Sequence, residues 1–159
     1  MYNCFDKPEF VVEEWASLGD IVVRKSFSNE IAQVKDLFER IFVGTVFGHT
    51  PAFEVATDSE QIYVALLDDK IVGFASVWEP DQFVHYLCVS PDARHKKVGS
   101  TIVSSLVAIY GVPLTLKCLT KNKDGIAFYL ATGWKKIEDG ISDDGAYVLL
   151  GYPVGEERM

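Results

Sequence analysis

Several patterns that mark common protein classes are missing from this 159-residue sequence. No apolar run approaches the ~18 residues of a membrane span. The cysteines, Cys4, Cys88 and Cys118, show no CxxC or Cys/His spacing, which argues against a disulfide framework and a metal site. The acidic N-terminus lacks the basic-then-apolar layout of a signal peptide. We therefore expect reduced thiols, no metal, no membrane association and a cytoplasmic protein.

Positive charge is also scarce, with 15 Lys and Arg against 23 Asp and Glu and a formal net charge of −8. That balance argues against nucleic acid as a partner. No repeat, low-complexity segment or long linker divides the chain. We expect one domain over 1–159, with 1–19 as a lead-in, and a chain of this length buries roughly 70% of its unfolded surface.

The hydrophobic pattern predicts the element order β-α-loop-β-β-β-α-β-α-β-β. This order indicates a mixed α/β (α+β) domain with a largely antiparallel sheet and a right-handed parallel β-α-β crossover over 82–119. Ser28 stands where an N-cap would precede the first helix. The expected strands are 20–27, two strands that form a hairpin over 61–79, then 82–89 and 112–119, and a final hairpin of 134–139 and 146–154. The expected helices are one that follows Ser28 and ends at about 41, one over 99–111 and one over 123–133.

A basic cluster, Arg94, His95, Lys96 and Lys97, lies between a predicted strand and the helix that opens near Gly99. A helix N-terminus offers unpaired N–H groups and roughly half a positive charge, a combination that binds phosphate. The alternative is a solvated basic loop. Neither GxxxxGK[ST] nor GxGxxG is present, so the junction is neither a P-loop nor a dinucleotide fingerprint.

Two blocks within about 83–134 resemble the GNAT superfamily of N-acetyltransferases. The first, "VSPDARHKKVGSTIVSSL", resembles the family's coenzyme A signature, a strand ending in V-x-P and then [R/Q]-x-x-G-x-[G/A] opening a helix. The second, "LTLKCLTKNKDGIAFYLATGW", resembles the block that follows it. The aligned residues are Val89, Pro91, Arg94, Gly99 and Ser100, then Asn122, Ala127, Phe128, Tyr129, Gly133 and Trp134.

The resemblance implies a GNAT-like fold and acetyl-CoA as co-substrate. It implies that Leu87, Cys88 and Val89 hydrogen-bond the pantetheine arm as a missing strand would. Asn122 would contact that arm, and Tyr129 would stand near the sulfur. The pyrophosphate would lie on backbone N–H groups of the segment Arg94, His95, Lys96, Lys97, Val98, Gly99 and Ser100.

Two residues depart from the family pattern. Lys97 occupies the place of the family's first glycine, where the backbone closely approaches phosphate and the turn needs unusual dihedral angles. We expect coenzyme binding to survive, because the lysine stem can fold away. Lys117 stands where some members carry a catalytic glutamate, so that route to proton abstraction is closed.

Amine acetylation needs an acid for the departing thiolate and a base for the amine. Tyr129 is the expected acid; the alternative is that it only packs beside Phe128. His85 is the expected base, placed on the same strand face as Leu87, and imidazole titrates near neutral pH. The alternative is a buried, satisfied histidine. Weaker candidates for the base are Glu79, Glu54 and His49, or a water chain.

The acceptor site is expected between the segments 43–55 and 139–146. Asp139, Asp143 and Asp144 either attract a cationic amine or only keep a turn soluble. Trp78, Phe47 and Phe53 either line an apolar part of the site or pack in the core. The acceptor itself, a small-molecule or peptide amine, stays open, and homodimers are common in the resembling family.

The expected function is therefore an N-acetyltransferase that moves an acetyl group from acetyl-CoA to a primary amine by direct transfer in a ternary complex. One alternative is a non-catalytic acyl-CoA-binding or regulatory module on the same fold. Another is a nucleotide-binding α/β domain unrelated to coenzyme A, which the missing glycine motifs argue against.

Overall fold

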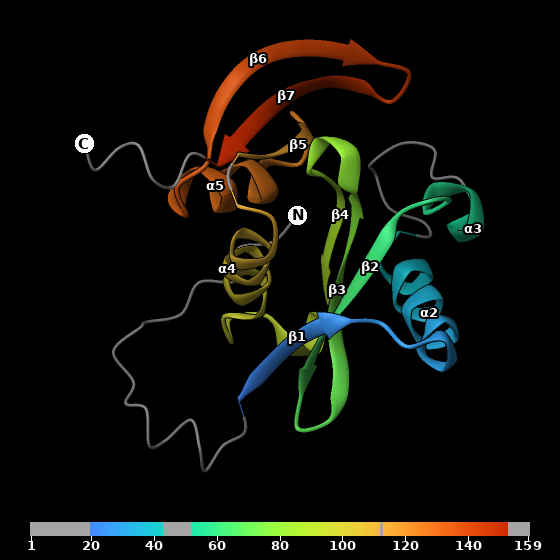
Figure 1. The fold of residues 1–159 in the computed structure, drawn as a ribbon. Coiled ribbons are helices and arrows are strands. Elements are labelled where there is room, and N and C mark those ends of the chain that lie inside the picture. The colour runs from blue at the N-terminus through green and yellow to red at the C-terminus, as the bar shows by residue number, and fades with distance from the viewer. Residues whose placement is uncertain (1–19, 43–51, 112, 153–159) are drawn as a thin grey trace.

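The computed structural model describes residues 20–42, 52–111 and 113–152 (Figure 1). The expected lead-in, 1–19, lies outside these residues. None of the described helices is both long and apolar enough to cross a membrane. The elements are, in chain order, β1 (Ile21–Lys25), η1 (Ser28–Glu30), α2 (Ile31–Phe42), α3 (Phe53–Ala56), β2 (Gln61–Leu67), β3 (Lys70–Trp78), η2 (Glu79–Asp81), β4 (Phe83–Val89), η3 (Pro91–Ala93), α4 (Val98–Tyr110), β5 (Leu114–Leu119), α5 (Lys123–Ala131), β6 (Lys135–Ser142) and β7 (Gly145–Tyr152).

The strands form one seven-stranded sheet in the order β1-β2-β3-β4-β5-β7-β6. All neighbours are antiparallel except β4 and β5, which are parallel and are connected through α4. Figure 1 shows α2 and α3 on one face of the sheet and α4 and α5 on the other, with the β6–β7 hairpin arching beyond the end of β4. The predicted fold class, a mixed α/β domain with a mostly antiparallel sheet and one β-α-β crossover, is confirmed.

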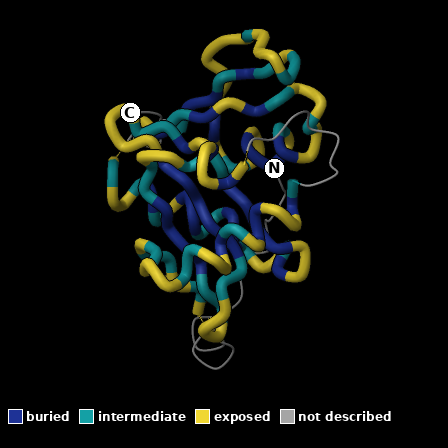
Figure 2. The backbone as a smooth tube through the Cα atoms, turned by 90° about the vertical axis from the view of Figure 1, so that its right-hand side faces the viewer, coloured by how far each residue is buried: buried dark blue, intermediate teal, exposed yellow. Residues whose placement is uncertain are grey.

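Each face of the sheet carries its own hydrophobic core, and the buried segments run through the centre of the molecule (Figure 2). On one face α4 buries Val98, Ile102 and Leu106 against the strands. On the other face α2 buries Val34, Leu37, Phe38 and Ile41, which recur at helical spacing, while Ile31 is only partly buried; Leu37 and Phe38 are each 2% exposed. These two cores fix β3 and β4 between helices, which is what positions the site described below.

Helix α2 does not begin as the sequence predicted, because Ser28 lies inside the 3₁₀ turn η1 rather than at an N-cap. The carboxylate of Glu30 takes over that role: it accepts the N–H of Phe27 at 2.8 Å and pairs with Arg24 at 2.9 Å. The hydrogen bond from Arg24 and that from Phe27 lower the pKa of Glu30 to about 2. The entry to α2 is thus held by an ion pair to β1.

The final hairpin is longer than predicted. Residues 140–142 were expected in the turn but belong to β6, and β7 starts at Gly145, which leaves only Asp143 and Asp144 between the strands. A two-residue connection needs a residue with unusual dihedral angles at its end, and Gly145 supplies a φ of +125°. The two aspartates therefore form the tip of a continuous hairpin rather than part of a longer loop.

Candidate functional site

Strand β4 has one edge that is almost unpaired. Its ladder with β5 holds a single residue pair among the described residues, Phe83 with Thr115, while its other edge pairs with β3 as far as Val89. The side chains of Leu87 and Val89 are buried in the core, at 3% and 1% exposure. The edge that faces β5 therefore presents backbone groups alone, which is what an extended ligand needs in order to bind like a strand.

The basic loop that follows β4 has a strained backbone. After the 3₁₀ turn η3, His95 and Lys97 adopt φ values of 66° and 69°, in the left-handed region. Lys97 is the N-cap residue of α4, and its side chain makes no capping hydrogen bond to this helix. The N-cap side chain therefore does not occupy the first-turn N–H groups of Val98, Gly99 and Ser100. The expectation that Lys97 occupies a position requiring unusual dihedral angles is confirmed.

We expect Lys97→Gly to raise the free energy of unfolding by about 1 kcal/mol, because the left-handed conformation costs a non-glycine residue roughly that amount. Lys97→Ala removes the same side chain but keeps the Cβ atom, so it should bring no such gain. The difference between the melting temperatures of the two variants measures the strain, and parallel titration with acetyl-CoA measures its effect on binding.

Lys96→Gly is the control, since Lys96 is exposed and has no left-handed backbone. Glycine there should give no gain, because it only adds conformational freedom to the unfolded chain. Equal melting temperatures for Lys97→Gly and Lys97→Ala would mean that the loop carries no strain at this position.

The second motif block places Asn122 and Tyr129 at opposite ends of α5. Asn122 is the N-cap of α5, and its Oδ1 accepts the N–H of Gly125 at 3.0 Å, which uses one of the two lone pairs of that oxygen. Tyr129 is 4% exposed, and its ring packs against Phe128 at 5.2 Å and Trp134 at 5.5 Å between centroids. The packing of Tyr129 beside Phe128 is thus observed, and the acid role of Tyr129 stays a prediction.

His85 does not lie on the strand face that the sequence predicted. The register of β3 and β4 shifts here, so that Ser76 pairs with Tyr86 but Val77 pairs with Val84, and His85 is the extra residue of a β-bulge. Val84 rather than His85 therefore shares the α4-side core with Leu87. The expectation that His85 and Leu87 share a face is wrong, because one inserted residue reverses the alternation of side chains.

The bulge brings His85 to a carboxylate that the sequence did not single out. His85 Nδ1 lies 2.8 Å from Oε2 of Glu60, whose side chain is 7% exposed against 43% for His85. The hydroxyl of Ser76 donates to the other oxygen of Glu60. The imidazole also stacks on Tyr86 at 4.6 Å. His85 is thus partly exposed and not the buried, satisfied histidine of the alternative.

The tip of the last hairpin approaches the same region. Burial raises the pKa of Tyr86 to about 12, and the negative charges of Glu60 and Asp144 contribute to that rise. The charge of Asp144 can act on Tyr86 only if the β6–β7 turn lies near β4. The start of β2 thus lies beside His85, and the hairpin tip lies within electrostatic range of Tyr86.

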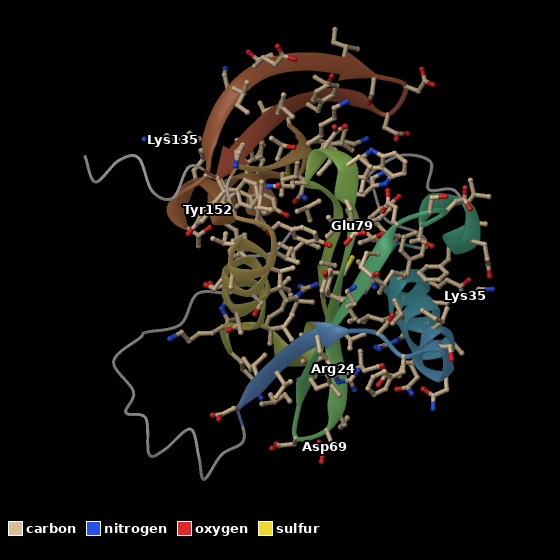
Figure 3. All side chains as sticks on the ribbon, viewed as in Figure 1. Arg24, Lys35, Asp69, Glu79, Lys135 and Tyr152 are labelled. Atoms are coloured by element: carbon tan, nitrogen blue, oxygen red, sulfur yellow. The ribbon has the colours of Figure 1, made fainter. Side chains whose placement is uncertain are left out.

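The weaker candidates for the base are engaged elsewhere. Glu79 directly follows β3, whereas Asp69 directly precedes it, so the two lie at different ends of the strand (Figure 3). The carboxylate of Glu79 accepts a hydrogen bond from the hydroxyl of Tyr110 at 2.5 Å. Glu54 forms an exposed ion pair with Lys35 at 2.8 Å. His49 and Phe47 lie outside the described residues. Of the residues expected at the acceptor site, Asp139 is engaged in an ion pair with Lys136 at 2.9 Å, and Phe53 is buried in the core at 3% exposure. Trp78 is 39% exposed.

The cysteines are unsuited to covalent catalysis. Cys88 and Cys118 are free and buried, and burial raises the pKa of both thiols. This agrees with the expectation of reduced thiols in strands, and Cys4 lies outside the described residues.

Lys117, at the place of the family's glutamate, is exposed and holds its ammonium 4.8 Å from the ring centroid of Tyr147. Within the described ranges no three His, Cys, Asp or Glu side chains gather as metal ligands would.

Comparison with known proteins identifies this arrangement. The family model for the acetyltransferase (GNAT) domain matches residues 58–136, about half of the chain. The matched segment contains the β2–β3–β4 meander, the strained loop, α4 and α5. The chain belongs to the GNAT superfamily of acetyltransferases. No curated protein sequence matches the chain significantly.

Solved structures share the fold at low sequence identity. The apo-form of YjaB from Escherichia coli superposes with a TM-score of 0.65 at 20% identity, covering 84% of this chain and 97% of that one. A GNAT-family acetyltransferase from Bacillus cereus gives 0.68 at 13% identity, covering 84% and 96%. Naa50 from Arabidopsis thaliana, in complex with the bisubstrate analogue CoA-Ac-MVNAL, gives 0.63 at 13% identity, covering 82% and 97%.

Proposed function

We propose that this protein is an acetyl-CoA-dependent N-acetyltransferase that transfers the acetyl group directly to a primary amine. One observation carries the proposal: the unpaired edge of β4 leads through the strained loop to the N-terminus of α4. A chain-like ligand with a pyrophosphate at one end matches that surface, because its amide-bearing arm can pair with a strand and its phosphates can bind helix N–H groups.

The residues present fit the coenzyme. The backbone of Leu87, Cys88 and Val89 would hold the pantetheine arm, since the side chains of all three are buried and only the edge is open to it. The loop from Arg94 to Ser100 would hold the pyrophosphate with backbone N–H groups, with cationic side chains at its rim. Asn122 would contribute a contact from the start of α5.

The chemistry assigns one task to each polar group. Acetyl-CoA supplies the acetyl group as a thioester. His85 takes the proton that the acceptor ammonium must lose before its nitrogen attacks the carbonyl carbon. A backbone N–H at the open edge of β4 donates to the carbonyl oxygen as negative charge develops there. Tyr129 donates its hydroxyl proton to the sulfur as the C–S bond breaks, and the second proton, which the nitrogen loses as the amide forms, restores the phenol.

The acceptor is expected to be a cationic amine. Glu60 and Asp144 place negative charge near His85 and Tyr86, and an amine is protonated before it binds. Direct transfer needs both substrates bound at once. Naa50, a structural neighbour, holds an analogue that joins coenzyme A to a peptide, which supports a ternary complex for this chain too.

A second function, acyl-CoA binding without catalysis, is favoured by the burial of Tyr129 in an aromatic cluster with Phe128 and Trp134. The same coenzyme site would then serve as a sensor. Both functions predict coenzyme binding and differ only in turnover.

The test of the proposed function is a thermal-shift titration with acetyl-CoA, coenzyme A, ATP and NAD, followed by an assay of amine-dependent thiol release from acetyl-CoA. A ligand at 100 times its Kd adds roughly 2.7 kcal/mol, or several degrees in Tm for a domain of this size. We expect a shift with the two coenzyme A species alone, and thiol release with at least one of spermidine, lysine or a short peptide. A shift without any turnover favours the sensor, and no shift with millimolar acetyl-CoA rejects both functions.

A further inference from the structure

A nearly buried carboxylate lies beside the proposed base. Glu60 precedes β2, its side chain is 7% exposed, and both of its oxygens accept a hydrogen bond. Ser76, which is fully buried on β3, donates to Oε1, and His85 Nδ1 lies 2.8 Å from Oε2. A carboxylate held at both oxygens in a buried position has a fixed direction, so it orients whatever it contacts.

The contact decides which ring nitrogen of His85 is basic. A neutral imidazole carries one proton, and a carboxylate can only accept a hydrogen bond. With Glu60 at Nδ1, the proton of the neutral ring resides on Nδ1, and Nε2 keeps its lone pair. The ring is stacked on Tyr86 with an interplanar angle of 22° yet remains 43% exposed. His85 is thus held from two sides and still reachable.

We propose that Glu60, anchored by Ser76, is a positioning residue that holds His85 in the Nδ1–H tautomer so that Nε2 takes the proton of the acceptor amine. The inference rests on the proposed function, in which His85 is the base. The carboxylate also stabilises the imidazolium that forms when the proton arrives. The titratable groups that face His85 in the described part of the chain are Glu60 from the start of β2 and Tyr86 from β4, with Asp144 acting on Tyr86 from the β6–β7 turn.

The tautomer can be measured without any acceptor. Long-range proton–nitrogen correlation spectra of the ¹⁵N-labelled full chain separate protonated from unprotonated ring nitrogens, and His85→Gln assigns the His85 signals among the three histidines. At a pH where the imidazoles are neutral, we expect Nδ1–H for His85 in the wild type. In Glu60→Ala the ring should revert to the Nε2–H tautomer that free imidazole side chains prefer. An Nε2–H tautomer in the wild type would overturn the proposal.

Steady-state kinetics test whether the contact between Glu60 and His85 contributes to kcat. With acetyl-CoA and the best amine of the panel above, Glu60→Ala should lower kcat at least tenfold with an unchanged KM for acetyl-CoA, since general-base catalysis contributes roughly 10²–10⁴-fold. His85→Ala should lower it further, and adding Glu60→Ala to His85→Ala should cost nothing more. Asp58→Ala is the control: it removes a carboxylate two residues away that is exposed, and its kcat should match the wild type.

The outcomes separate the inference from the proposed function. Full activity of Glu60→Ala together with an impaired His85→Ala rejects the role of Glu60 and leaves His85 as the base. Full activity of His85→Ala rejects both the positioning role of Glu60 and the role of His85 as the base. If Glu60→Ala does not fold, Glu60→Gln keeps the shape and one acceptor oxygen while removing the charge; its kcat should still fall, and an unchanged kcat would overturn the proposal.

Discussion

Tyr129→Phe should lower kcat about 100-fold while the Kd for acetyl-CoA stays within a factor of two, because loss of a general acid typically costs 10²–10⁴-fold. The substitution removes only the hydroxyl from a ring that is 4% exposed and packed against Phe128 and Trp134. The aromatic contacts remain, so the fold and the coenzyme site should remain as well. Steady-state kinetics with the best amine, and calorimetric titration with acetyl-CoA, give the two quantities.

Tyr152→Phe is the matched control for this prediction. Tyr152 belongs to the same aromatic cluster, with its ring 5.3 Å from Trp134, so the same hydroxyl is removed beside the same indole. Its kcat should equal that of the wild type. A Tyr129→Phe variant with unchanged turnover would leave Tyr129 as a packing residue and move the acid role to solvent. Absence of turnover in the wild type, with coenzyme binding intact, would instead support the non-catalytic module.

The order of the elements could be predicted because it depends on local signals. The hairpin expected over 61–79 is present, and its turn consists of Asp68 and Asp69, both in the left-handed region. The spacing of apolar residues in α2 and α4 marks the faces that are buried. Helix ends were less predictable, since Glu30 rather than Ser28 holds the start of α2 through a contact with Arg24 on another element.

The composition of the site could be predicted only in part. The family resemblance identified the loop at Lys97, because the family pattern has a glycine at this place. The backbone keeps the unusual dihedral angles of that glycine although the residue here is a lysine. It could not reveal the bulge at His85, since alternation in a single strand says nothing about an extra residue relative to its neighbour. Glu60 was missed for the same reason: it is 25 residues from His85, and only the sheet register brings them together.

The geometry of the proposed coenzyme loop, the segment from Arg94 to Ser100, depends on a residue that no motif contains. Gly73 lies in β3 opposite Val89, where the first turn of α4 crosses the strand. A methyl group at Gly73 would lie 2.7 Å from the carbonyl oxygen of Cys88 and 3.1 Å from Cγ1 of Val98. The first of these contacts is with the backbone, which cannot rotate away as a side chain can. Either β4 or the start of α4 must move.

We therefore expect Gly73→Ala to lower the free energy of unfolding by about 2 kcal/mol, the usual cost of one extra carbon in a packed core. It should also raise the Kd for acetyl-CoA at least tenfold, because a shift on the order of 1 Å in positioning groups is enough to spoil their alignment. Denaturant unfolding measures the first effect and calorimetric titration the second. Both effects have a single cause, the displacement of Val98 and Cys88 from the positions that frame the coenzyme loop.

Gly111→Ala separates loss of stability from loss of the site. Gly111 ends α4 with a φ of +79°, so alanine is strained there, but among the described residues the added carbon meets no non-neighbouring atom within 4 Å. Its free energy of unfolding should fall by roughly 1 kcal/mol with an unchanged Kd for acetyl-CoA. If Gly73→Ala is destabilised but binds acetyl-CoA as the wild type does, the contact between β3 and α4 supports the fold alone, and the coenzyme loop is held by its own backbone. If binding fails with Gly73→Ala only, the buried glycine of β3 sets the position of the helix N-terminus that the coenzyme requires.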